Sequence, residues 1–170
     1  MPVILKINLT GGPGLIDALQ RKGPRIVQVL TSKLNALLFT LQSYIVSEKL
    51  SGQMLKRGTG ALSASVRIIP AEFNATNIIG GIESSGGPAF YGKFFEIESA
   101  GGTGGTKAHT IMAVKARALR FVMGGEVYFR KSVLHPGFAA RPFMTSSLAE
   151  NAEAIKSELQ AALDKEILEP

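Results

Sequence analysis

The chain has 170 residues, of which 45% are hydrophobic, and it carries a net charge of +6 at pH 7 without a cysteine. This length fits one domain with short extensions, and the lack of cysteine excludes disulfides, thiolate metal sites and cysteine nucleophiles. No apolar run reaches the roughly 18 residues that a membrane-spanning helix needs.

The charges are distributed unevenly along the chain. Basic residues dominate residues 1–60, and acidic residues dominate residues 136–170. A basic segment of this kind can bind nucleic acid, or it can stack head-to-tail on the acidic segment of another copy. We favour stacking, because the basic residues are scattered and form no continuous run.

The N-terminal residues predict a strand followed by a long helix. Residues 1–9 are apolar, and they lack the basic leader and cleavage site of a secretory signal. Residues 1–24 form an extension that we expect to become ordered on assembly. A helical pattern begins at Leu15 and is firmer from Pro24 to about Leu50. Its apolar residues recur at steps of three and four: Ile26, Leu30, Leu34, Leu37, Leu38, Leu41, Tyr44 and Ile45.

Two strands and a short helical segment follow. Apolar and polar residues alternate from Leu62 to Ile68, as in a half-buried strand that Pro70 ends. Residues 77–84 predict its hairpin partner. Residues 91–98 place aromatic side chains at helical spacing, so we expect one or two turns that bring Tyr91, Phe94 and Phe95 to the core.

Residues 118–133 predict a hairpin, because two apolar runs are joined by Gly124 and Gly125. A proline-rich segment, residues 134–142, follows, and we call it the elbow. An amphipathic helix is predicted from Pro142 to Leu163. The order of these elements predicts a single α+β domain over residues 25–170. We expect a mainly antiparallel four-stranded sheet packed against the long N-terminal helix and the C-terminal helix.

The glycine-rich residues 100–108 do not form a nucleotide-binding motif. A Walker loop needs Gly-Lys followed by Ser or Thr, whereas Lys107 here follows Thr106 and precedes Ala108. We expect a mobile loop at these positions.

Catalytic and metal-binding patterns are missing as well. His109 and His135 are the only histidines, and no pair of ligands has helical or hairpin spacing. His135 is better explained as a residue at the end of a strand. Glu96 and Glu98 are a candidate pair of catalytic carboxylates, but Glu96 is better explained as a structural cap or bridge. We therefore expect no enzymatic activity, no cofactor and no metal.

The 118–133 hairpin suggests nucleic-acid binding as an alternative function. Basic and aromatic side chains together can follow a phosphate backbone and stack on bases. The simpler explanation is that the basic residues flank strands while the aromatic rings lie in the core. The residues concerned are Lys115, Arg117, Arg120, Phe121, Tyr128, Phe129, Arg130 and Lys131.

Several short motifs occur in an order typical of one known family. They comprise Thr59, Gly60, Leu62 and Ser65; Tyr91 and Glu96; Ala118 to Phe121; and His135, Pro136, Gly137, Ala140, Arg141, Pro142 and Phe143. From Arg25 to Leu163 the chain resembles the tail-completion, or head–tail joining, family of minor structural proteins in long-tailed double-stranded DNA bacteriophages. The family's glutamate segment usually runs directly into Gly-Thr, whereas Ile97, Glu98 and Ser99 intervene here.

The resemblance implies a structural virion protein that assembles in the host cytoplasm and forms a ring at the phage neck. Six copies are expected, with twelve as the alternative. The implied partners are further copies of the chain, the tail tube protein, and the head–tail connector or stopper protein. DNA would pass through the channel without sequence-specific binding, and no membrane would be involved.

The resemblance also points to structural or interface positions, most of them in the elbow. Pro136 and Pro142 restrict the backbone on either side of Gly137. Arg141 either makes a two-pronged contact with a carboxylate, for which Glu96 is the candidate, or caps nearby backbone carbonyls. The full set is Gly60, Leu62, Tyr91, Glu96, His135, Pro136, Gly137, Arg141, Pro142 and Phe143.

Overall fold

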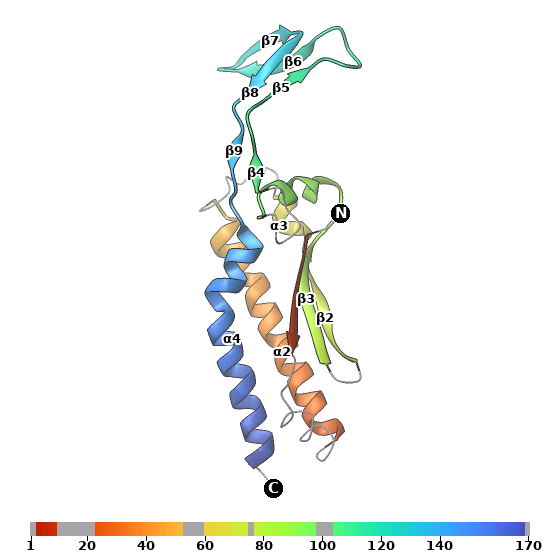
Figure 1. The fold of residues 1–170 in the computed structure, drawn as a ribbon, viewed down its shortest axis with the longest axis vertical. Coiled ribbons are helices and arrows are strands. Elements are labelled where there is room, and N and C mark those ends of the chain that lie inside the picture. The colour runs from red at the N-terminus through yellow and green to blue at the C-terminus, as the bar shows by residue number, and fades with distance from the viewer. Residues whose placement is uncertain (1–2, 10–22, 53–59, 75–76, 98–103, 169–170) are drawn as a thin grey trace.

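The described residues form two long helices, a three-stranded sheet and an arm of paired strands that projects from one end of the molecule (Figure 1). The computed structural model describes residues 3–9, 23–52, 60–74, 77–97 and 104–168. Thr59, Glu98, residues 100–103 and the helical pattern around Leu15 therefore lie outside the described residues. The class is α+β, as the sequence predicts.

The long N-terminal helix is present as predicted. α2 (Pro24–Tyr44) continues into the π-helical turn η1 (Ile45–Lys49), so the helical stretch ends next to the predicted Leu50. Proline suits the first turn, because an N–H is not needed there. The buried side chains follow the predicted spacing: Ile26, Leu30, Leu34, Leu38, Leu41 and Ile45.

The C-terminal helix α4 (Phe143–Leu168) runs five residues past its predicted end at Leu163. It packs along α2 in the opposite chain direction (Figure 1). Phe143, Met144, Ile155 and Leu159 are buried in the shared core. The burial of this apolar face, more than helix propensity, is what stabilises such a helix.

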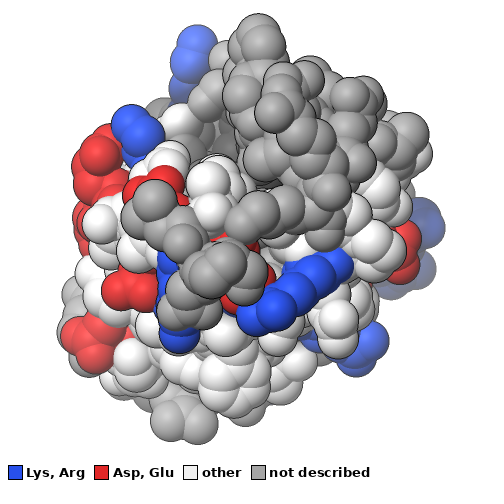
Figure 2. Space-filling model, turned by 90° about the horizontal axis from the view of Figure 1, so that it is seen from below, with Lys and Arg blue, Asp and Glu red and all other residues white. Residues whose placement is uncertain are grey.

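A ladder of ion pairs joins the same two helices. It comprises Arg25 with Glu166 at 2.9 Å, Lys33 with Glu158 at 2.6 Å, and Lys49 with Glu150 at 2.7 Å. Seen from below, basic and acidic side chains are intermixed on this end of the molecule (Figure 2). Three basic and three acidic residues of the two segments thus pair within one chain, so part of the charge polarity is used internally. The expectation that the polarity is directed at another copy stays a prediction.

The sheet contains β1 (Val3–Leu9), β2 (Val66–Asn74) and β3 (Asn77–Ser84), in the order β1-β3-β2, with antiparallel pairing throughout. The initial strand thus pairs inside its own chain, whereas we expected ordering on assembly. α2 covers one face of the sheet, and Ile78 and Ile82 lie buried against it.

β2 differs from its prediction at both ends. Ala61–Ser65 forms the short helix α3, because Gly60 adopts a left-handed conformation and the Ser65 hydroxyl donates to the Leu62 carbonyl. The strand then passes through Pro70, which we expected to end it. Proline is tolerated because β2 is an edge strand, and the register shifts between Ile69 and Glu72.

The second hairpin does not join this sheet, so the expected four-stranded sheet is not formed. Three separate antiparallel pairs build the arm, which we define as residues 104–139. They are β4 (Gly105–Thr106) with β9 (Phe138–Ala139), β5 (His109–Met112) with β8 (Ser132–His135), and β6 (Leu119–Met123) with β7 (Glu126–Arg130). β4 and β9 form a stem that holds the hairpin away from the helices (Figure 1).

The predicted aromatic turns exist as the 3-10 helix η2 (Gly87–Phe94). Tyr91 is 68% exposed, so the expectation that it contributes to the core is wrong. Gly92 is buried instead, and a Cβ there would lie 2.9 Å from Leu62 and 3.5 Å from Phe143. At Gly92 the backbone of η2 itself packs closely against the core.

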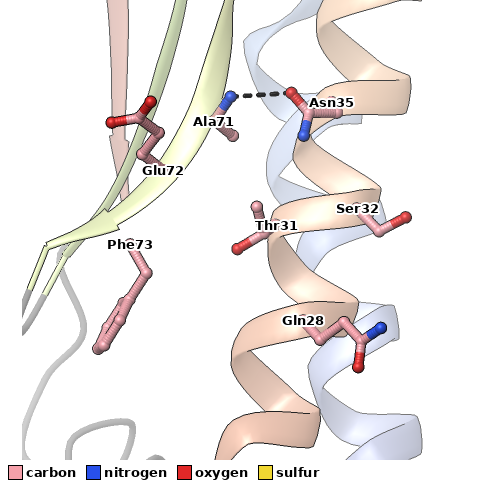
Figure 3. A pocket seen from close by; sticks show the side chains of 7 residues that line it. All are labelled: Gln28, Thr31, Ser32, Asn35, Ala71, Glu72 and Phe73. Carbon is pink, nitrogen blue, oxygen red and sulfur yellow. Dashed lines mark hydrogen bonds between the residues drawn. The ribbon is translucent and has the colours of Figure 1, made fainter.

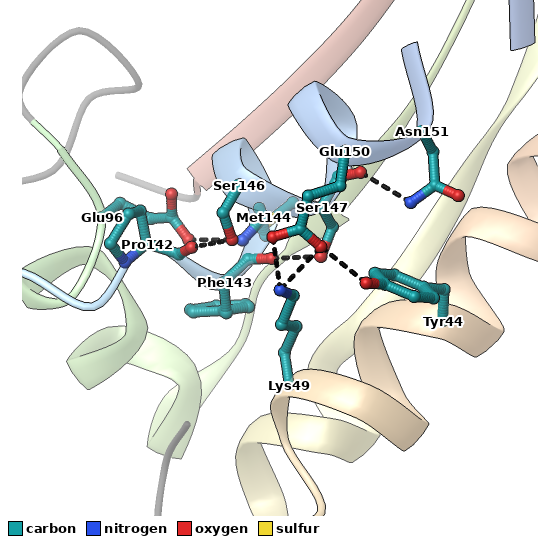
Figure 4. Close-up of polar contacts among 10 residues, drawn as sticks. All are labelled: Tyr44, Lys49, Glu96, Pro142, Phe143, Met144, Ser146, Ser147, Glu150 and Asn151. Carbon is teal, nitrogen blue, oxygen red and sulfur yellow. Dashed lines mark hydrogen bonds and ion pairs between the residues drawn. The ribbon is translucent and has the colours of Figure 1, made fainter. Parts of the chain in front are cut away.

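Stability should depend on pH through the Glu150 contacts. Lys49 donates hydrogen bonds of 2.7 and 2.8 Å to Glu150, and Tyr44 donates one of 2.6 Å (Figure 4). The hydrogen bond from Lys49, followed by that from Tyr44, lowers the pKa of Glu150 below its ordinary value of 4.5. The carboxylate therefore stabilises the fold above pH 4.5, and this contribution is lost as the pH falls through the lowered pKa.

We expect the thermal midpoint of Glu150→Gln to fall less than that of the wild type on acidification from neutral pH. Circular dichroism across the acid range measures this difference. Glu153→Gln, at an exposed position of the same helix, is the matched control and should follow the wild type. Identical acid slopes for the wild type and Glu150→Gln would contradict the assignment.

Candidate functional site

A buried carboxylate caps α4 at the elbow. Glu96 is fully buried, and its Oε1 accepts a hydrogen bond of 2.8 Å from the Met144 amide (Figure 4). Its Oε2 accepts the Thr145 amide at 3.3 Å and the Thr145 hydroxyl at 2.8 Å. The first amides of a helix have no partner inside the helix, and the helix dipole favours an anion beside them. A residue 48 positions away therefore serves as the cap.

Two backbone hydrogen bonds next to the Glu96 side chain also hold the elbow and the start of the arm. The Phe95 carbonyl accepts the Arg141 amide at 2.8 Å, and the Glu96 carbonyl accepts the Gly104 amide at 2.9 Å. The side chain holds the start of α4, while the main chain holds both strands leading into the arm. Helix, elbow and arm are therefore joined at one segment.

Glu96 is the structural cap that the sequence suggested, but its expected partner is wrong. The Arg141 side chain is exposed and, within the described residues, bonds to neither a carboxylate nor a carbonyl. The helix amides occupy the carboxylate in its place. Arg141 contributes its backbone amide to the elbow and presents its guanidinium to the surface.

The stem depends on two interlocked glycines. Gly105 and Gly137 have φ angles of 98° and 78°, which favour glycine. A Cβ on Gly105 would collide with the Phe138 carbonyl oxygen, and one on Gly137 would collide with that of Thr106. Only a stem without these two side chains allows its strands to approach so closely. The described end of the predicted mobile loop is thus part of a strand pair.

The two histidines face each other at the base of the arm. His109 and His135 are cross-strand partners whose rings stack with a centroid distance of 5.1 Å. The His135 Nδ1 accepts the Gly137 amide at 3.0 Å, and the His109 Nδ1 lies 2.9 Å from the Lys107 carbonyl oxygen. The prediction that His135 ends a strand is confirmed. The described residues contain no group of three or more side chains suited to a metal ion.

The ten positions derived from the resemblance fall into groups. Leu62 and Phe143 both lie near Gly92 of η2. Glu96 and Pro142 lie at the first turn of α4 (Figure 4). His135 ends β8, and Pro136 and Gly137 connect β8 to the stem strand β9. Gly60 starts α3. The side chains of Tyr91 and Arg141 are exposed.

The predicted hairpin at Gly124 and Gly125 is confirmed, with φ angles of 63° and 90°. Its aromatic rings are not fully buried, so the simpler explanation, that they lie in the core, is wrong. Phe121 and Tyr128 stack at 5.8 Å and are half-buried, whereas Phe129 is 60% exposed. Tyr128 and Phe129 differ in exposure because neighbouring residues of a strand point to opposite faces.

The arm exposes an unusual amount of apolar surface for a segment without a covering helix. Eight of its large hydrophobic side chains are exposed: Ile111, Met112, Val114, Val122, Met123, Val127, Phe129 and Leu134. The arm is also basic, with Lys107, Lys115, Arg117, Arg120, Arg130 and Lys131 against Glu126. Exposed apolar patches of this extent typically mark binding surfaces. The sequence analysis placed Val122, Met123, Val127 and Phe129 in a hairpin of the expected sheet and made no prediction for Ile111, Met112 and Val114. It therefore did not predict an exposed apolar surface here.

A second surface lies at the other end of the body, between α2 and β2. This α2–β2 groove has a volume of about 650 Å³ and is lined by Gln28, Thr31, Ser32, Asn35, Ala71, Glu72 and Phe73 (Figure 3). Asn35 Oδ1 accepts the Ala71 amide at 2.8 Å, next to the register shift of β2. The buried Thr31 hydroxyl has no hydrogen-bond partner among the described residues.

No family model, curated protein or solved structure matches the chain. Among the described residues, no helix is both long and apolar enough to span a membrane.

The Glu96 cap predicts a specific pattern of stability. Glu96→Ala should lower the free energy of unfolding by about 2 kcal/mol, because it removes a charged hydrogen-bond acceptor and leaves buried amides unpaired. Arg141→Ala should cost less than about 0.5 kcal/mol, since its side chain is at the surface. Urea unfolding measures both. An equal loss for the two variants would instead favour a Glu96–Arg141 pair.

Proposed function

We propose that this chain is a structural virion protein that forms a ring at the neck of a long-tailed double-stranded DNA bacteriophage. There it completes the tail and joins it to the head connector around the DNA channel. The observation that carries the proposal is the projecting arm with its exposed apolar side chains. Such a surface suits a protein that functions by binding other protein subunits.

The order of motifs supports the same function. The glutamate segment and the Ala-Arg-Pro-Phe segment meet where Glu96 caps α4, and the His-Pro-Gly segment lies at the stem, where Gly137 approaches Thr106. These residues orient the arm relative to the helices. We attribute no catalysis to Glu96 or His135, because both are engaged in structural hydrogen bonds.

The proposed partners are further copies of the chain, the tail tube protein and the connector or stopper protein. A ring requires two different surfaces on each subunit, repeated by rotation. Six copies would match a six-fold tail, and twelve copies remain the alternative. DNA would pass through the channel without sequence-specific contacts.

Particles produced without this chain should contain separate heads and tails. Electron microscopy of lysates distinguishes these from joined virions, and infectivity should fall by several orders of magnitude. Wild-type protein supplied in trans should restore joining, as should Lys165→Ala, whose change lies on α4 away from the arm. Joined, infectious particles in the absence of the chain would refute the proposed function.

Nucleic-acid binding is the second candidate, and one observation favours it. Arg120 and the exposed Phe129 are cross-strand partners, so a cation and an aromatic ring lie together on one face of the hairpin. This pairing suits a stacked base beside a phosphate.

Under this alternative, the chain should bind single-stranded DNA with an affinity that falls steeply as salt increases. Arg120→Ala and Arg130→Ala should each weaken binding and reduce the salt slope by about one unit. Fluorescence anisotropy with labelled oligonucleotides measures this, with Lys165→Ala as the control. Absence of binding at low salt would exclude the alternative.

A further inference from the structure

The base of the arm contains a hydrogen bond that only one charge state of a histidine can make. His135 ends β8, and its Nδ1 accepts the amide of Gly137 at 3.0 Å. A backbone amide can only donate, so this nitrogen carries no hydrogen and the ring is neutral. A protonated imidazole has a hydrogen on both ring nitrogens, and no rotation of the ring restores an acceptor. The bond to Gly137 therefore requires neutral His135.

This hydrogen bond fixes the turn that leads from β8 into the stem strand β9. The side chain of His135 binds an amide two residues later, as the side chain of asparagine does in an Asx turn. Gly137, the residue held in this way, has a left-handed φ of 78° and lies close to the Thr106 carbonyl of the opposite strand. Loss of the bond would leave the half-buried Gly137 without its amide contact and would release the turn.

The second histidine makes the same place sensitive to charge. His109 is the cross-strand partner of His135, and the two rings stack with a centroid distance of 5.1 Å. The His109 Nδ1 lies 2.9 Å from the Lys107 carbonyl oxygen, which can only accept, so this nitrogen donates. When both rings take up a proton, two positive charges face each other across the strands. Like charges directly opposite each other destabilise a strand pair.

The elements that pack against the histidines offer little compensation for added positive charge. β4, β5, β8 and β9 contain no lysine, arginine, aspartate or glutamate. Among the described residues, neither histidine forms an ion pair. The Glu96 carboxylate of the adjoining segment already binds the start of α4, and Glu98 lies outside the described residues. The other charged side chains of the adjoining segments are cations: Lys93, Lys107, Lys131 and Arg141.

A row of rings connects the histidines to the elbow. Phe138 of β9 meets the His135 ring edge-on, with a centroid distance of 6.4 Å and an interplanar angle of 76°. The Phe138 ring in turn lies 5.1 Å from that of Phe95. The Phe95 carbonyl accepts the Arg141 amide at 2.8 Å, directly before the Glu96 cap. A displacement of the His135 ring therefore affects the stem and also its attachment to the helices.

We propose that His109, His135 and Gly137 form an acid-sensitive latch, which fixes the direction of the arm at neutral pH and releases it on acidification. Histidine is the side chain that ordinarily gains its charge between pH 8 and pH 5. As the pH falls through this range, a proton on His135 removes the acceptor for Gly137, and repulsion from His109 separates the ends of β5 and β8. The helices keep their packing, because the Glu150 contribution is lost only below pH 4.5. The latch is a property of the single chain and does not depend on the proposed ring.

The absence of cysteine allows spin labels to be placed at chosen positions. Val122→Cys on β6 and Glu153→Cys on α4 are suitable, because both positions are exposed. Double electron–electron resonance should give one narrow distance distribution at pH 8. At pH 5 the narrow component should fall by about half or more, while circular dichroism shows unchanged helix content. A distribution that is identical at the two pH values would overturn the proposal.

Two substitutions at His135 separate the hydrogen bond from the titration. In His135→Asn, the amide oxygen can take the place of Nδ1 and accept the Gly137 amide without changing charge. The distribution should stay narrow at both pH values. His135→Ala has no acceptor, so its distribution should be broad already at pH 8. Broadening of His135→Asn by acid to the same extent as the wild type, or a narrow distribution in His135→Ala, would each contradict the latch.

His109→Phe is the matched control, because it keeps a ring opposite His135 but removes the second charge. Its distribution should still broaden on acidification, since His135 continues to gain a proton, but to a smaller extent than in the wild type. A response that vanishes in His109→Phe and persists in His135→Asn would show that the Gly137 hydrogen bond is not the acid-sensitive contact, and the proposal would be wrong.

Discussion

The arrangement of the molecule depends on the hydrogen bonds that the buried Glu96 carboxylate accepts at the start of α4. It binds the first amides of α4, while the carbonyls of Phe95 and Glu96 hold the two chain segments that lead into the arm. A buried anion is costly unless it is fully hydrogen-bonded. Here the helix terminus supplies the donors, so the cost is offset by three hydrogen bonds and the helix dipole. The direction of α4 and the origin of the arm are consequently set by the same few atoms.

Sequence patterns predicted the local elements better than their assembly. The spacing of Ile26, Leu30 and Leu34 located α2, and the paired glycines at 124 and 125 located the hairpin, because both signals are local. The prediction of a four-stranded sheet was wrong. Alternating apolar and polar residues show that one face of a strand is apolar, but not whether that face packs on a helix of the same chain or on a partner outside the chain. The sequence analysis recognised Glu96 as structural. It did not find its partners, because they include backbone amides, which nearly every residue has and which therefore leave no sequence pattern.

The ion-pair ladder changes how the charge pattern is understood. A chain that is basic at its start and acidic at its end suggests head-to-tail stacking of copies. Three ion pairs between the N-terminal helical stretch and α4, however, use part of this charge within the chain. Exposed ion pairs contribute little to stability, so the two helices are held together mainly by their shared apolar core. The arm carries a further concentration of charge, with six basic residues and a single acid.

The interlocked glycines of the stem have a mechanical consequence. Because a Cβ on Gly105 or Gly137 would meet the opposite main chain, a substitution at either position has to push the two strands of the stem apart. The stem joins the arm to the start of α4, so such a change would redirect the arm relative to the helices. In the ring that we propose, the same change would alter the direction of the arm in every subunit at once.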